Sequence, residues 1–156
     1  FKNPLLDEDL NINFFSYDSH MIIKAKFEKF SEPLVKNLKN IQGGSFNDVI
    51  PGIIHFTFNN NDYSLLPTIA PSGRFFIVFG DQTNGNESYG GGRFLYINPP
   101  QKNGDIIIDF NKAYNPPCVF STFTTCPIPS KENILPFKVN AGEKNYNGIL
   151  FSSVYQ

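Results

Sequence analysis

The sequence predicts a mainly β domain, either an antiparallel β-barrel or a sandwich of about eight or nine strands with at most one or two short helices. Three observations support this. Aromatic residues make up 15% of the chain, and they are all Phe or Tyr. Gly, Pro and Asn are frequent between the apolar stretches, a composition that favours strands and turns. Apolar and polar residues alternate at the period of a strand. The 156 residues fit a single domain, 1–156.

The amino-terminal part of the chain predicts one short helix followed by strands. Leu6 to Ile12 is the candidate helix, because acidic residues suit the cap and the first turn. From Ile22 to Phe30, apolar and charged residues alternate as in a half-buried strand. The alternation at 54–58 predicts another strand, which the Asn-rich turn 59–62 connects to Tyr63 to Leu66 as a hairpin.

The remaining elements are also strands. A turn at 71–73 precedes a continuous apolar run, 74–79, which predicts a central strand covered on both faces. A loop that ends in Asn103-Gly104 joins two further stretches as a hairpin. Further strands are predicted at 93–97, 105–110, 135–139 and 148–154.

The charge balance limits the partners. The chain has 13 basic and 14 acidic residues, and Arg74 and Arg93 are its two arginines. Because nucleic-acid backbones are bound by basic, often arginine-rich surfaces, we expect no nucleic-acid partner. No apolar run reaches transmembrane length. The compartment stays open: cytoplasmic, or exported or lipid-anchored if a signal segment preceded Phe1.

The first candidate site is the glycine-rich loop 80–93, which follows the predicted central strand. Three consecutive glycines let backbone N–H groups approach an anion, and Arg93 adds a bidentate fork. Asp81 and Glu87 would act as an acid/base pair or hold Arg93 in place. Alternatively, the loop is a tight corner in which Asp81 or Thr83 caps the turn. Neither a Walker nor a Rossmann pattern is present.

The second candidate is the irregular segment 109–133. Asp109 and Asn111 share one face at a strand end, where they would bind a substrate or satisfy the backbone of the next turn. For Asn115 we favour the turn. Cys118 and Cys126 would form a disulfide in an oxidising compartment and remain packed thiols in a cytosol.

The sequence favours neither a metal site nor a cysteine nucleophile with a histidine base. The cysteine spacing lacks the short pair typical of zinc sites, and His20 and His55 lie far upstream, so no metal site is expected. His55 is interpreted as a surface residue of its strand. The segment 141–144 predicts a turn with a solvated ion pair, which would belong to a site only if the fold brought it there.

Several motifs in the chain resemble domain-of-unknown-function family 1684, a family of bacterial and archaeal proteins. The resemblance is carried by the stretch 79–94, by 109–118, by Cys126-Pro127, and by Glu132-Asn133 with Leu135-Pro136. At 14–17 the chain departs from the family pattern, which puts the pairing of the amino-terminal segment in question. The resemblance implies a mostly β domain of bacterial origin with a polar site around the two motifs, but no activity, substrate or cofactor.

Three hypotheses follow for the function. In the first, loop 80–93 and segment 109–133 form one pocket for a small anionic molecule, in a binding protein or an enzyme. Its ligand-binding residues would be Asp81, Thr83, Glu87, Tyr89, Arg93, Asp109, Asn111 and Tyr114. In the second, Arg93 pairs with an acid inside a structural or envelope-associated module, and the motifs only pin loops. The third, a flavin-binding split barrel, rests on fold analogy.

Overall fold

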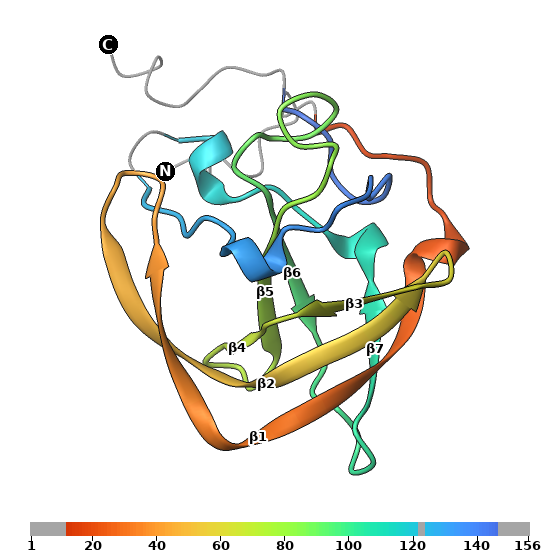
Figure 1. Ribbon diagram of the computed structural model, residues 1–156. Helices are drawn as coiled ribbons and strands as arrows, with labels where there is room; N and C mark the ends of the chain where they lie inside the picture. Colours follow the sequence, from red (N-terminus) through yellow and green to blue (C-terminus); the bar gives the residue numbers. More distant parts are fainter. Residues whose placement is uncertain (1–11, 122–123, 147–156) are drawn as a thin grey trace.

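The computed structural model describes residues 12–121 and 124–146, and within them the fold is mostly β (Figure 1). Two antiparallel sheets enclose one core. The larger has the strand order β3-β2-β1-β7 and the smaller has the order β4-β5-β6. The strands are β1 (Ile22–Lys39), β2 (Ser45–Phe58), β3 (Asn61–Leu65), β4 (Thr68–Ile69), β5 (Phe75–Phe79), β6 (Arg93–Ile97) and β7 (Asp105–Asp109). Short 3-10 helices are η2 (Ser19–Met21), η3 (Phe110–Lys112), η4 (Pro117–Val119) and η5 (Lys131–Asn133).

The inner faces of the two sheets form the core. On β5, Phe75, Ile77 and Phe79 are buried, and the two residues between them are half-buried on the outer face. This alternation follows from the two-residue period of a strand. The core also takes Ile23, Ile54, Leu65, Leu95, Ile106 and Ile108 from the other strands.

The distal half of the β1–β2 hairpin forms an arm, residues 34–50, which bends and rises along the left side of Figure 1. The register between the two strands shifts between Lys29 and Leu34. Residues 31–33 include a proline that cannot donate to the ladder, which explains the irregularity. Along the arm, Leu34, Val35 and Val49 are exposed.

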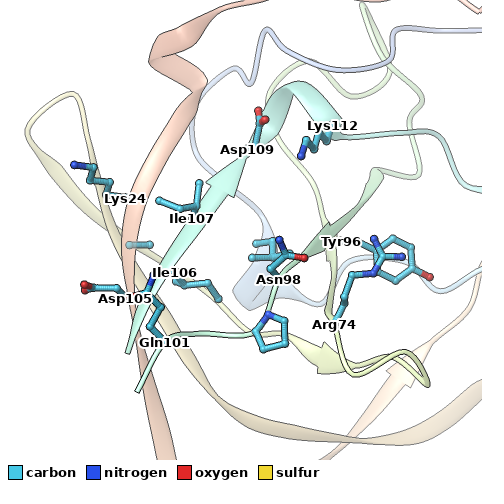
Figure 2. A pocket seen from close by; sticks show the side chains of 13 residues that line it. Lys24, Arg74, Tyr96, Asn98, Gln101, Asp105, Ile106, Ile107, Asp109 and Lys112 are labelled. Carbon is cyan, nitrogen blue, oxygen red and sulfur yellow. The ribbon is translucent and has the colours of Figure 1, made fainter. Parts of the chain in front are cut away.

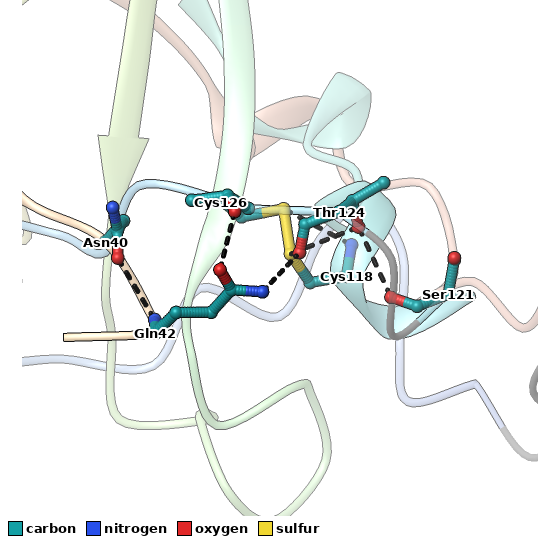
Figure 3. The surroundings of a disulfide bond; sticks show 7 residues. Asn40, Gln42, Cys118, Ser121, Thr124 and Cys126 are labelled. Carbon is teal, nitrogen blue, oxygen red and sulfur yellow. Dashed lines mark hydrogen bonds between the residues drawn. A yellow bond between two sulfur atoms is a disulfide. The ribbon is translucent and has the colours of Figure 1, made fainter. Parts of the chain in front are cut away.

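A disulfide-bonded loop fastens the tip of the arm (Figure 3). Cys118 and Cys126 form a disulfide, which answers the alternative that the sequence left open. The carbonyl of Cys126 accepts from the N–H of Ile41 at 2.9 Å, and the Gln42 side chain accepts from Thr125 Oγ1 at 2.7 Å. The segment 126–130, called the strap below, therefore runs against the arm.

Most of the predicted strands are confirmed, including the hairpin at 59–62, where Asn59 and Asn60 both have positive φ. The strand predicted at 135–139 is wrong. Its backbone bonds instead to the glycine-rich loop: Leu135 N–H donates to the Gly80 carbonyl at 2.8 Å, and Val139 N–H to the Asp81 carboxylate. The predicted helix at 6–12 and strand at 148–154 lie wholly or almost wholly outside the described residues.

None of the helices in the described ranges has the length and apolarity needed to cross a membrane.

Candidate functional site

Arg93 lies on the inner face of β6, and its side chain is fully buried. Its Nη2 donates to Asp81 Oδ1 at 3.2 Å and to the Val139 carbonyl at 2.8 Å. Its Nη1 donates to the carbonyls of Ala141 and Glu143. Among its nitrogens, Nε alone lacks an acceptor in the described part of the chain. Burial lowers the pKa of Arg93 and the charge of Asp81 opposes this, so the guanidinium stays charged.

The Asp81 carboxylate is equally occupied. Its Oδ2 accepts from Thr83 N at 3.2 Å, from Thr83 Oγ1 at 2.8 Å and from Val139 N at 2.7 Å. The Thr83 hydroxyl also bonds Ser88 Oγ at 2.7 Å. A buried ion pair whose lone pairs and protons are this fully bonded fixes the backbone around it. This arrangement is the one expected from the second hypothesis, in which Arg93 pairs with an acid inside the domain.

Two of the three consecutive glycines, Gly91 and Gly92, have a steric explanation. Gly92 has φ +86°, and a Cβ there would lie 2.5 Å from the Phe79 carbonyl oxygen. At Gly91 a Cβ would lie 2.5 Å from Cε1 of the Tyr89 ring, which covers this residue. Burial raises the pKa of Tyr89. Glu87 forms an ion pair with Lys138 at 2.8 Å, which lowers the pKa of the carboxyl.

Asp109 and Asn111 connect segments that are distant in sequence. Asp109 Oδ1 accepts from the backbone and side-chain N–H groups of Asn111, both at 3.0 Å, and caps η3. The Asn111 side chain bonds both the N–H and the carbonyl of Asp18. Asn115 is also structural, because its side chain donates to the Lys144 carbonyl at 2.8 Å.

A cavity of about 560 Å³ opens where the edge strands β6 and β7 face each other (Figure 2). We call it the β6–β7 groove. The structure brings Asp109 to it, but not Arg93. Arg74 and Tyr96 lie on one side, and Ile107, Asp109 and Lys112 on the other. The guanidinium carbon of Arg74 stands 4.4 Å from the centre of the Tyr96 ring.

The groove carries an excess of positive charge. Its basic residues are Lys24, Arg74 and Lys112, and its acids are Asp105 and Asp109. Asp105 forms an ion pair with Lys26, which lowers the pKa of the Asp105 carboxyl. The charge of Lys26 offsets the negative charge of Asp105. Within residues 12–121 and 124–146, no ion pair involves the three basic groups of the groove. They are therefore open to an external anion.

Tyr114 does not line the groove but contacts Tyr96, which does. Its backbone bridges Phe94 in both directions, at 2.8 and 3.0 Å, and so extends the edge of β6. Its ring stacks on Tyr96 with 6.1 Å between ring centres. Burial, together with the neighbouring Tyr96, raises the pKa of Tyr114, so its hydroxyl stays protonated at neutral pH.

Sequence reasoning missed Arg74 as a site residue. It is the first residue of the predicted central strand, 74–79, and directly precedes β5 in the structure. It has the parity of Phe76, opposite to the buried residues of β5. That parity is the signal that could have placed it on the outer face. Across the described residues, no group of three or more His, Cys, Asp or Glu side chains is placed to hold a metal ion.

Comparisons with known proteins identify the family but no activity. No curated protein gives a significant match to the chain. The solution NMR structure of an uncharacterized protein of Haloarcula marismortui is similar, with a TM-score of 0.69 and 27% identity over 85% of this chain and 75% of that one. A model of the family described as "Protein of unknown function (DUF1684)" matches residues 10–144. Because this match spans most of the sequence, the chain belongs to the DUF1684 family.

Proposed function

We propose that this protein binds a small anionic molecule in the β6–β7 groove, and that Arg74 is the residue that holds the anion. One observation carries the proposal: the Arg74 guanidinium lies 4.4 Å over the Tyr96 ring at a cavity of about 560 Å³, without an acidic partner in the described residues. A guanidinium stacked on an aromatic face keeps its N–H edges free for two parallel bonds to a carboxylate or phosphate. The cavity volume is typical of small-molecule sites.

The surrounding charges support this assignment. The ammonium groups of Lys112 and Lys24 would add electrostatic attraction for the anion. The Asp109 carboxylate caps η3 and would repel a second anionic group of the ligand placed close to η3. The ligand is thus still expected to be an anion, but Arg74 replaces Arg93 as the residue proposed to bind it. For Asp81, Thr83 and Arg93 we propose a structural role.

Thermal-shift and calorimetric titrations with a panel of small carboxylates and phosphates test the proposal. A ligand present at about 100 times its Kd stabilises the folded state by about 2.7 kcal/mol. The variant Arg74→Gln should abolish this shift. The matched control is Lys29→Gln, which removes one positive charge from an exposed position of β1 outside the groove. Anion binding that survives Arg74→Gln, or a panel without any binder at millimolar concentration, would contradict the proposal.

A further inference from the structure

The outer face of the smaller sheet continues from the groove toward the arm. Phe76 and Val78 lie on this face, opposite to the buried residues of β5. The Phe76 ring stands 5.0 Å from the Tyr96 ring, and Arg74 contacts the same Tyr96 ring at 4.4 Å. Arg74 and Phe76 are therefore neighbours on one surface, and Val78 follows them along β5.

A second cavity, of about 120 Å³, lies at the far end of this surface. Its apolar lining includes Leu38, Phe46 and Ile50 from the arm, Leu66 directly after β3, and Phe76 and Val78 from β5. This volume is slightly smaller than that of an engineered apolar cavity of about 150 Å³ that admits benzene. It has room for the end of an aliphatic chain.

Asn133 and Thr68, two polar residues at this cavity, bond to other groups of the protein. The side-chain amide of Asn133 bonds the N–H and carbonyl of Leu66 and the carbonyl of Val78, at 2.8 to 3.0 Å. The Thr68 hydroxyl donates to the Phe76 carbonyl, and Asp48 accepts from the N–H of its neighbour at 2.8 Å. Because Asn133 and Thr68 already have partners, they do not require a polar group from a ligand. The part of a ligand that enters this cavity can therefore be a hydrocarbon chain.

We propose that the ligand is an amphipathic anion, with its carboxylate at Arg74 and its aliphatic tail running past Phe76 into the cavity beneath the arm. This inference rests on the proposed function and specifies its substrate class. Val78 lies four positions after Arg74, which corresponds to about 13 Å along an extended strand. A medium-length straight chain spans this distance, whereas acetate occupies the head site alone.

A calorimetric series of straight-chain carboxylates from acetate to decanoate, kept below their micelle concentrations, tests the tail site. Each added methylene that becomes buried should raise the affinity about three- to four-fold. The variant Leu38→Trp should fill the cavity and weaken octanoate binding about tenfold or more, while acetate binding stays unchanged. Val35→Trp is the matched control, because Val35 is 64% exposed and belongs to the same strand but not to the cavity.

The outcomes separate the two proposals. A rising series that Leu38→Trp flattens and Val35→Trp does not would support the amphipathic ligand. Affinities independent of chain length, with binding that still requires Arg74, would overturn this inference and leave the proposed function intact. If phosphates bind but no carboxylic acid does, only this inference is overturned. If neither the acids, acetate included, nor the phosphates bind to the wild-type protein, both proposals are overturned. If Leu38→Trp does not fold, Thr68→Phe on the short edge strand β4 fills the same cavity and is expected to give the same result.

Discussion

Replacing Arg93 by Met should strongly destabilise the protein. The substitution removes the donors of the carbonyls of Val139, Ala141 and Glu143, and each costs about 1–3 kcal/mol if it stays dry and unpaired. The Asp81 carboxylate also loses the Arg93 guanidinium as its partner, but it still accepts three hydrogen bonds from Thr83 and Val139. Relaxation and entering water reduce the sum, so we expect a loss of about 3–5 kcal/mol, the range for a broken buried pair.

Urea unfolding followed by circular dichroism, together with thermal melting, measures this effect. For a domain of this size the loss corresponds to a fall in Tm of about 6–20 °C. Arg74→Met is the internal control: the same side chain is then removed from an exposed position where it stacks on Tyr96, and the stability should change by about 1 kcal/mol or less. A loss below about 1 kcal/mol for Arg93→Met would refute the view that this buried network pins the loops.

Three other changes have defined outcomes. Gly92→Ala should cost about 2 kcal/mol or more in urea unfolding, because φ is +86° and the new Cβ would meet a carbonyl oxygen of β5; a neutral effect would show that the corner relaxes freely. Replacing Cys118 and Cys126 by Ser should cost about 2–3 kcal/mol, and intact protein should resist alkylation until a reductant is added; alkylation without reductant would contradict the disulfide. Burial raises the pKa of Glu143 above its ordinary 4.5. The protonated carboxyl therefore adds to the free energy of unfolding in full below pH 4.5, and this stabilisation is lost as the pH rises through the pKa of the folded state. Glu143→Gln should therefore gain stability relative to the wild-type protein between pH 4 and pH 7, and parallel pH profiles of the two proteins would argue against this.

The β class and most strand positions follow from local patterns in the sequence. The positive φ values at Asn59 and Asn60 are what an Asn-rich hairpin turn predicts, and the apolar run of β5 does become the central strand of its sheet. The stretch 135–139 has the same alternation but no strand. Its hydrogen bonds go to a loop and to the Asp81 side chain, and local periodicity does not specify such partners.

The candidate site was harder to predict for a physical reason. A glycine-rich loop followed by arginine has the same local signature whether the arginine faces a ligand or folds inward onto carbonyls. For Arg93, the carbonyls that decide this come from residues 139–143, about 50 positions later in the chain. Arg74, by contrast, follows a single turn glycine, Gly73, and has no acidic neighbour in sequence, so only its parity with Phe76 indicates where it lies.

The register shift in the β1–β2 hairpin has a dynamic consequence. Beyond this shift, the two strands of the arm pair only with each other. The arm is otherwise held by backbone hydrogen bonds to the strap and by side-chain contacts such as the Lys36–Glu132 ion pair. Native-state hydrogen exchange should therefore report two cooperative units, with the amides of residues 34–50 exchanging through a local opening and those of residues 22–29 through global unfolding. Opening of the arm alone would uncover the apolar cavity while the core stays folded.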